Sequence, residues 1–237
     1  MNATVACLAM DFGGTIATPG PSPNGADVVE VLRSRFGYSV PAGFATVVDQ
    51  VRAEAKTAYR ACGRQTGWDT ILAVSAERVG VTLPDTRRLA EVIWEDVPDA
   101  VVDPVAAETV RRLRAAGMVL VLACNTQRSL AARQRTLVQA RIADCFAALV
   151  LSSVVGVGKP DPVFYAAVTT AARKATGCGP DAVVFVGDTM GKDVLGARRY
   201  GMHAVLVAPG PRPTGLPEDV PVVAQVSGLP ALLDRWP

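Results

Sequence analysis

Short apolar runs alternate with amphipathic segments along this 237-residue chain, and that alternation limits its fold more than any other feature. The runs are β-branched and apolar at consecutive positions, which is typical of strands covered on both faces of a parallel sheet. The alternation therefore predicts an open α/β sheet. The expected strands are Thr4–Met10, Met118–Cys124, Ala147–Ser153, Ala182–Gly187 and His203–Ala208, with helices at Val105–Ala116, Arg128–Ala140, Pro162–Ala175 and Lys192–Tyr200, a loop at Pro209–Val220, and a last strand and short helix within Val222–Pro237.

One region, from about Pro21 to Pro98, has helical patterns but no convincing buried strand. An all-helical insert of this size, directly after the first strand, predicts a separate cap over the sheet. We therefore expect a helical cap domain of residues 20–98 and an α/β core domain of residues 1–19 and 99–237. The cap helices are expected at Ala26–Phe36, Gly43–Ala61, Thr70–Val79 and Thr86–Val97.

The composition excludes several classes of protein. Half of the residues are hydrophobic, 19% are charged and the net charge is +2, so disorder, general nucleic-acid binding and a membrane-surface role are not expected. No apolar segment is long enough to span a bilayer, and the first ten residues lack the basic region of a signal peptide. The five cysteines have no metal-ligand spacing, which favours reduced thiols and a cytoplasmic protein.

Ligands of parallel α/β sheets bind beyond the carboxyl ends of the strands, so the residues after each apolar run are the candidates for a site. Asp11 ends the first run and is followed by Phe-Gly-Gly-Thr. A carboxylate at this place can attack phosphorus, and the backbone amides that follow can bind an anion. A solvated aspartate at a strand–loop junction is the alternative. The second strand ends in the polar sequence Cys124-Asn125-Thr126.

Two later motifs carry further charged groups. The sequence GDTMGKD places Asp188 at the end of a strand and Asp193 at the start of the next helix, where both can face one Mg²⁺ ion. Helix capping is an alternative role for Asp193. The sequence GKPDP supplies Lys159, which can neutralise a phosphate together with the nucleophile, or can be an ordinary surface lysine.

The order of these motifs, with a helical insert after the first, resembles the haloacid dehalogenase-like (HAD) hydrolase superfamily over nearly the whole chain. The resemblance implies a Rossmann-like core with a helical cap, Asp11 as a nucleophile that forms an aspartyl-phosphate, and Lys159 as the residue that holds the phosphate. It implies Mg²⁺ as the cofactor, held by Asp11, the backbone carbonyl of residue 13 and Asp188, with Asp193 supporting the metal. The expected phosphate-binding residues are Gly13, Gly14 and Thr15 of the first loop and Cys124, Asn125 and Thr126 of the second.

The sequence departs from the family pattern at two positions. Gly13 stands where the phosphatases of the family usually have a second aspartate, which protonates the leaving oxygen and then deprotonates the attacking water. Loss of such an acid–base costs roughly 10²–10⁴-fold, and more for alkoxides than for acyl or aryl phosphates. Cys124 stands where the family usually has Ser or Thr, and a thiol is a weaker donor, for which Asn125 or Thr126 could compensate in part.

We expect a Mg²⁺-dependent phosphohydrolase that acts on a small phosphorylated metabolite, as a monomer or homodimer. One alternative is a catalytically impaired binding protein with this fold. Another is a C–P hydrolase resembling phosphonoacetaldehyde hydrolase, which needs a cap lysine, and the expected cap has only Lys56. A haloacid dehalogenase also lacks the second acid, but it needs no metal, so Asp188 and Asp193 count against it.

The cap offers candidates for substrate binding. Arg52, Lys56, Tyr59 and Arg60 fall on one face of the segment Gly43–Ala61, and such a face favours an anionic or sugar-like substrate if it faces Asp11. A solvated basic face is the alternative. Further candidates for the pocket are Arg64 and Trp68, whereas His203, the single histidine, is expected to be structural.

Overall fold

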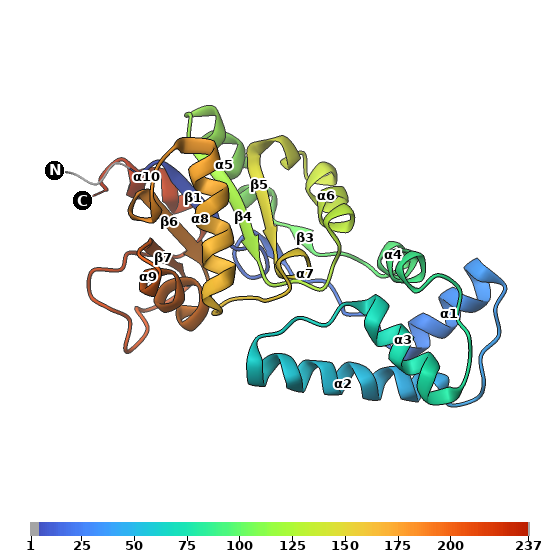
Figure 1. Cartoon of the computed structure of the whole chain (residues 1–237). Coiled ribbons are helices and arrows are strands. Elements are labelled where there is room, and N and C mark those ends of the chain that lie inside the picture. Colours follow the sequence, from blue (N-terminus) through green and yellow to red (C-terminus); the bar gives the residue numbers. More distant parts are fainter. Residues whose placement is uncertain (1–4, 237) are drawn as a thin grey trace.

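The computed structural model describes residues 5–236 and has a six-stranded parallel sheet at its centre. The strand order is β5-β4-β1-β6-β7-β8, so β1 lies between β4 and β6 near the middle (Figure 1). All five expected core strands and the expected last strand are present; Thr4 and Pro237, the outermost residues of two expected elements, lie outside the described residues. The strands are β1 (Cys7–Met10), β4 (Val119–Cys124), β5 (Phe146–Leu151), β6 (Val183–Gly187), β7 (His203–Val207) and β8 (Val222–Val223).

Both faces of this sheet are covered, which explains why its strands are apolar at every position. Leu8 and Met10 pack into a cluster with Val110 of α5, whereas Cys7 and Ala9 pack on the other face with Val168 of α8. The sequence therefore predicts the parallel α/β architecture correctly. The flanking helices are α5 (Pro104–Ala115), α6 (Leu130–Gln139), α8 (Pro162–Thr176) and the short α7 (Ser152–Val155), α9 (Ala197–Arg199) and α10 (Leu229–Leu233).

The insert is helical, and its hydrophobic cluster includes Leu32, Val48, Ile71 and Ile93; among the described residues, Ala132 of α6 is its one buried member from outside the insert. Figure 1 shows α1, α2 and α3 grouped to one side of the sheet, with α4 between this group and α6. The separate cluster supports the proposed division into a cap domain (20–98) and a core domain (1–19 and 99–237). The helices are α1 (Gly25–Phe36), α2 (Phe44–Cys62), α3 (Trp68–Val79) and α4 (Thr86–Asp96).

The chain enters and leaves the insert through a small antiparallel sheet that the sequence does not predict. Its strands, β2 (Ala17–Thr18) and β3 (Val101–Val102), have two residues each, too few to give an apolar pattern. Gly20 lies so close to the backbone of Asp99 that a Cβ atom would overlap it, so the two connections run side by side.

The segment after β6 also differs from its expectation. An ordinary helix was expected over Lys192–Tyr200, but the segment Met190–Gly196 forms a π-helical turn that continues into α9. This wider turn returns Asp193 to the end of β6, where its carboxylate accepts a hydrogen bond from the backbone N–H of Thr189 at 2.8 Å. Gly187 leaves the space that this carboxylate fills, because a Cβ atom there would overlap it.

Within residues 5–236, no helix is both long and apolar enough to cross a membrane.

Candidate active site

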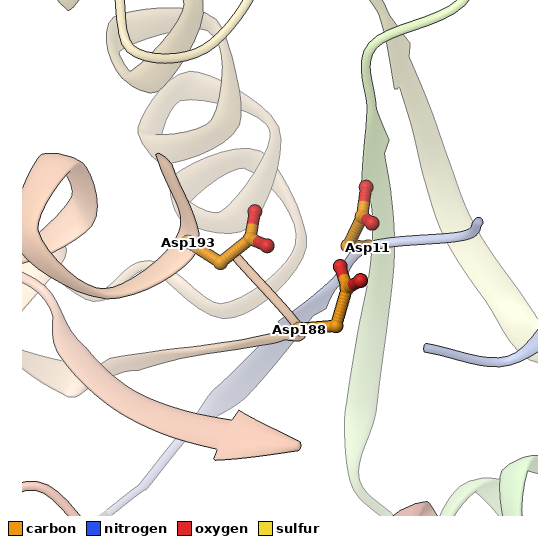
Figure 2. A group of neighbouring side chains, drawn as sticks. All are labelled: Asp11, Asp188 and Asp193. Carbon is orange, nitrogen blue, oxygen red and sulfur yellow. The ribbon is translucent and has the colours of Figure 1, made fainter. Parts of the chain in front are cut away.

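Three aspartates meet at the carboxyl end of the central strands. Asp11 follows β1, Asp188 follows β6, and Asp193 belongs to the π-helical turn. Each offers a carboxylate oxygen, and the three oxygens lie within 4.8 Å of one another. Figure 2 shows the carboxylates pointing toward one another from these separate segments. The structure thus brings together the three acidic residues that the sequence predicts as one site.

Lys159 is the cation of this cluster. Its side chain is buried, and Nζ lies 2.7 Å from Oδ1 of Asp11 and 2.7 Å from Oδ1 of Asp193. Burial alone would lower the pKa of Lys159, but the charges and hydrogen bonds of the two aspartates raise it above the usual range. The interpretation as an ordinary surface lysine is therefore wrong.

Lys159 does not fully neutralise the negative charge of the three carboxylates. Three carboxylates and one ammonium group leave a formal charge of −2. Burial raises the pKa of Asp188, and the charge of Asp11 raises it further. Burial also raises the pKa of Asp193, against the opposing effect of Lys159. A small divalent cation with oxygen ligands fits this donor set in charge and in chemistry, and Mg²⁺ has these properties.

The first loop, residues 12–15, packs closely against Asp188, and the backbone N–H of Gly14 donates to the carbonyl of Ala17 at 2.8 Å. Gly14 has φ +83°, and a Cβ atom there would overlap the Asp188 carboxylate, so glycine is needed for both reasons. A Cβ atom added to Gly13 would lie 3.2 Å from the Cγ atom of Pro19. Thr15 is buried, and its hydroxyl has no hydrogen-bond partner among the described residues.

Asn125 holds Lys159 in place and links it to the cap. Its Oδ1 accepts the backbone N–H of Lys159 at 2.7 Å, and its Nδ2 donates to the carbonyl of Lys159 at 2.9 Å. The same Nδ2 lies 2.6 Å from the hydroxyl of Tyr59 in α2. Both ends of the amide are thus engaged by protein groups, so Asn125 acts as a positioning residue.

The neighbours of Asn125 have different surroundings. Cys124 is buried, and burial raises its pKa to about 11, although Arg133 acts in the opposite direction, so the thiol stays protonated near neutral pH. Thr126 donates its backbone N–H to Ser152 Oγ at 2.8 Å, and its hydroxyl accepts the backbone N–H of Arg128 at 3.0 Å.

A cavity of about 710 Å³ extends from the carboxylates to the cap. Its wall includes Asp11, Gly13, Lys159, Asp188 and Asp193 of the core, and also Cys124, Asn125 and Thr126. From α2 it includes Arg52, Lys56 and Tyr59, so the predicted basic face of this helix is turned toward the nucleophile.

Other candidates from the cap lie elsewhere. Among the described residues, the wall of this cavity does not include Arg60, Arg64 or Trp68. Arg64 forms an isolated antiparallel bridge with Val157. Trp68 is buried in the hydrophobic cluster of the insert, where its ring lies edge-on to that of Trp94 with the ring centres 6.1 Å apart. An aromatic side chain is ambiguous in sequence, because it suits a hydrophobic core as well as a pocket. His203 is exposed and packs against Trp236, in agreement with a structural role.

The wall also contains two arginines that the sequence patterns do not indicate as site residues. Arg128 lies 2.8 Å from Asp99, and the buried Arg133 lies beside them. The sequence does contain an indication that Arg133 is buried, because helical spacing puts it on the same face of α6 as Thr136 and Leu137, which are buried.

Comparison with known proteins agrees with this geometry. The sequence model of the haloacid dehalogenase-like hydrolase family matches residues 5–201 of this chain. A phosphoserine phosphatase of Thermus thermophilus is 34% identical over 137 residues, which are 58% of this chain and 53% of that protein. The chain thus spans about half the length of this curated relative.

Solved structures share the fold. A 2-haloacid dehalogenase from Pseudomonas syringae has a TM-score of 0.69 at 20% identity, with 99% of this chain and 100% of that chain covered. A HAD phosphatase from Thermococcus onnurineus has a TM-score of 0.55 at 20% identity, with 96% and 97% covered. Since the family model covers most of its length, the chain belongs to the haloacid dehalogenase-like hydrolases.

Proposed function

We propose that this chain is a Mg²⁺-dependent phosphohydrolase that acts on a small phosphorylated metabolite through an aspartyl-phosphate. The observation that carries the proposal is the buried Asp11 carboxylate, held by Lys159 beside two further carboxylates. The relative that is named a phosphoserine phosphatase supports a phosphate ester as the substrate class.

Each residue of the cluster has a role in this reaction. Asp11 attacks phosphorus, and the bond between phosphorus and the leaving oxygen breaks, with its electron pair going to that oxygen. Lys159 holds the Asp11 carboxylate through the ion pair of 2.7 Å and neutralises charge on the phosphoryl group. A water molecule then hydrolyses the aspartyl-phosphate and restores Asp11. Mg²⁺, held by Asp11, Asp188 and the carbonyl of Gly13 with support from Asp193, would supply positive charge to the phosphoryl oxygens when bound.

The first loop determines which leaving groups the proposed reaction tolerates. Gly13 has no side chain to protonate the leaving oxygen, and Pro19 occupies the space next to it. We therefore expect acyl and aryl phosphates to react faster than alkyl phosphates, since their leaving groups need little protonation.

Two observations favour this proposal over the alternatives. Lys56 lines the cavity but is exposed, whereas a lysine that forms a Schiff base is commonly activated by burial, so C–P cleavage is less favoured. The carboxylate cluster with its residual negative charge suits a metal-dependent reaction better than a metal-free dehalogenation.

The test is phosphate release in the presence of Mg²⁺ from acetyl phosphate, p-nitrophenyl phosphate and O-phosphoserine. We expect turnover that falls roughly a thousand-fold or more in Asp11→Asn, because the nucleophile is lost. Asp234→Asn, an exposed aspartate at the end of α10, is the matched control and should match the wild type. Equal rates for wild type and Asp11→Asn on all three substrates would refute the proposal.

A further inference from the structure

Arg133 is a buried cation whose hydrogen-bonding capacity is mostly unused. Only 5% of the residue is exposed, and Nε and Nη1 have no hydrogen-bond partner among the described residues. The guanidinium lies flat against the protein, with Cζ 3.7 Å from the centre of the Phe12 ring. Nη2 lies 3.5 Å from the hydroxyl of Thr126, a long hydrogen bond. Arg133 is part of the cavity wall that also holds Asp11.

The nearest acid, Asp99, is already engaged by other groups. Its Oδ1 accepts Nε of Arg128 at 2.8 Å and the backbone N–H of Ala100 at 2.6 Å, and its Oδ2 accepts the hydroxyl of Thr136. Arg133 comes no closer to Asp99 than 4.0 Å, at Nη1. Asp99 thus makes its short ion pair with Arg128 and leaves Arg133 only the longer one of 4.0 Å.

Cys124 does not supply the missing negative charge. Burial raises the pKa of this thiol to about 11, so it is neutral near pH 7 even though Arg133 favours the thiolate. The contact with Phe12 offsets part of the cost of burying Arg133, but it uses the face of the guanidinium and leaves Nε and Nη1 without a hydrogen-bond partner among the described residues. A buried charge that has only a distant counter-ion is costly, and an anion in the cavity would lower that cost.

We propose that Arg133 forms a second anion subsite, which binds a carboxylate carried by the phosphorylated substrate. The proposal rests on the proposed function and narrows its substrate class to phosphate esters with a carboxylate. A guanidinium presents paired N–H groups in one plane, which match the two oxygens of a carboxylate.

Arg133 reaches the cavity from another element than the groups around Asp11, and it lies beside Phe12 and Thr126. Lys159 and Asp193, which surround Asp11, come from the segment before α8 and from the turn after β6. Arg133 comes from α6, which contacts β3 and α4 at the junction with the cap. The cavity of about 710 Å³ reaches both groups, so one small molecule can span them.

The test uses two phosphonates that cannot be hydrolysed and differ only in charge, 3-phosphonopropionate and its carboxamide. Their affinities are measured by calorimetry with Mg²⁺ for the wild type, Arg133→Met and Arg133→Lys. Since a hydrogen-bonded charge contributes about 1.5–3 kcal/mol, we expect the wild type to bind the carboxylate about 10–100-fold more tightly than the amide. Arg133→Met should lose this preference and keep its affinity for the amide, and Arg133→Lys should keep part of the preference.

Arg135→Met is the matched control, because it removes an arginine from an exposed position of the same helix and should keep the full preference. Thermal unfolding checks that each variant is folded. Equal binding of the two probes by the wild type would overturn the carboxylate subsite alone. A preference that survives in Arg133→Met, or an equal loss of both probes, would show that Arg133 does not bind the carboxylate. If neither probe binds the wild type, the phosphate site fails as well, and both proposals fall.

Discussion

Gly14 combines a left-handed backbone conformation with close contact to Asp188, a proposed metal ligand. Its φ of +83° disfavours any side chain, and the Asp188 carboxylate occupies the place of a Cβ atom. We expect Gly14→Ala to lose about 1–2 kcal/mol of stability from the left-handed conformation and, in addition, to displace Asp188. Calorimetric titration with Mg²⁺ should then show affinity at least about 10-fold weaker, which corresponds to 1.4 kcal/mol.

Gly80→Ala separates the two effects. Gly80 ends α3 with φ +68°, and a Cβ atom there meets no other atom within 4 Å. This variant should lose similar stability and bind Mg²⁺ as the wild type does. Equal Mg²⁺ affinities in the two variants would show that Asp188 is not needed for binding.

At the residue scale, sequence identifies site residues when they follow a strand. Asp11 and Asp188 directly follow buried strands, so the sheet fixes where they meet. Arg133 could not be assigned with the same ease, because an arginine in an amphipathic helix is usually a surface residue. Its burial depends on Phe12 and Asp99, and their positions require the tertiary structure.

At the scale of elements, α2 connects the cap to Lys159, the proposed phosphate-binding lysine. Tyr59 contacts Asn125, which holds both backbone groups of Lys159. We expect Tyr59→Phe to lower stability by about 0.5–1.5 kcal/mol through the lost hydrogen bond, and also to lower kcat/KM, because α2 is no longer tied to the second loop. Urea unfolding and steady-state kinetics with acetyl phosphate measure the two effects.

The control for this prediction is Tyr38→Phe. The hydroxyl of Tyr38 donates to the carbonyl of Thr82, which is a bond within the insert. Its loss should lower stability to a similar extent and leave kcat/KM unchanged. If both variants changed kcat/KM alike, the contact between Tyr59 and Asn125 would have no special role in the reaction.

The accuracy of the predicted elements follows from their length and periodicity. Long amphipathic helices such as α2 and strands buried on both faces such as β4 have strong patterns and lie close to their expected bounds. The strands β2 and β3 are too short for a pattern. The π-helical turn depends on contacts that sequence does not show, since Gly196 packs directly against the hydroxyl of Tyr165 in α8.

At the scale of the whole molecule, the close approach of like charges in the proposed metal site opposes folding. The carboxylates of Asp11, Asp188 and Asp193 come from separate segments and are brought together only when the chain folds. Burial and the charge of Asp11 raise the pKa of Asp188, so the ionised form of this residue is disfavoured in the folded protein. Removing that charge should therefore stabilise the metal-free protein, at the expense of metal binding.

The variant Asp188→Asn tests whether this carboxylate lowers the stability of the metal-free protein while it binds the metal. Its thermal unfolding is measured with EDTA and with Mg²⁺. In EDTA we expect a Tm about 2–4 °C above the wild type, which corresponds to roughly 1 kcal/mol, an upper value because solvent screens this exposed carboxylate. With Mg²⁺ at about 100 times its Kd, the wild type should gain about 2.7 kcal/mol and become the more stable of the two. Asp234→Asn should follow the wild type in both conditions, since Asp234 is exposed at the end of α10. If Mg²⁺ raised the stability of wild type and Asp188→Asn equally, the ion would bind elsewhere. If the variant had a lower Tm than the wild type in EDTA, Asp188 would stabilise the fold even without metal.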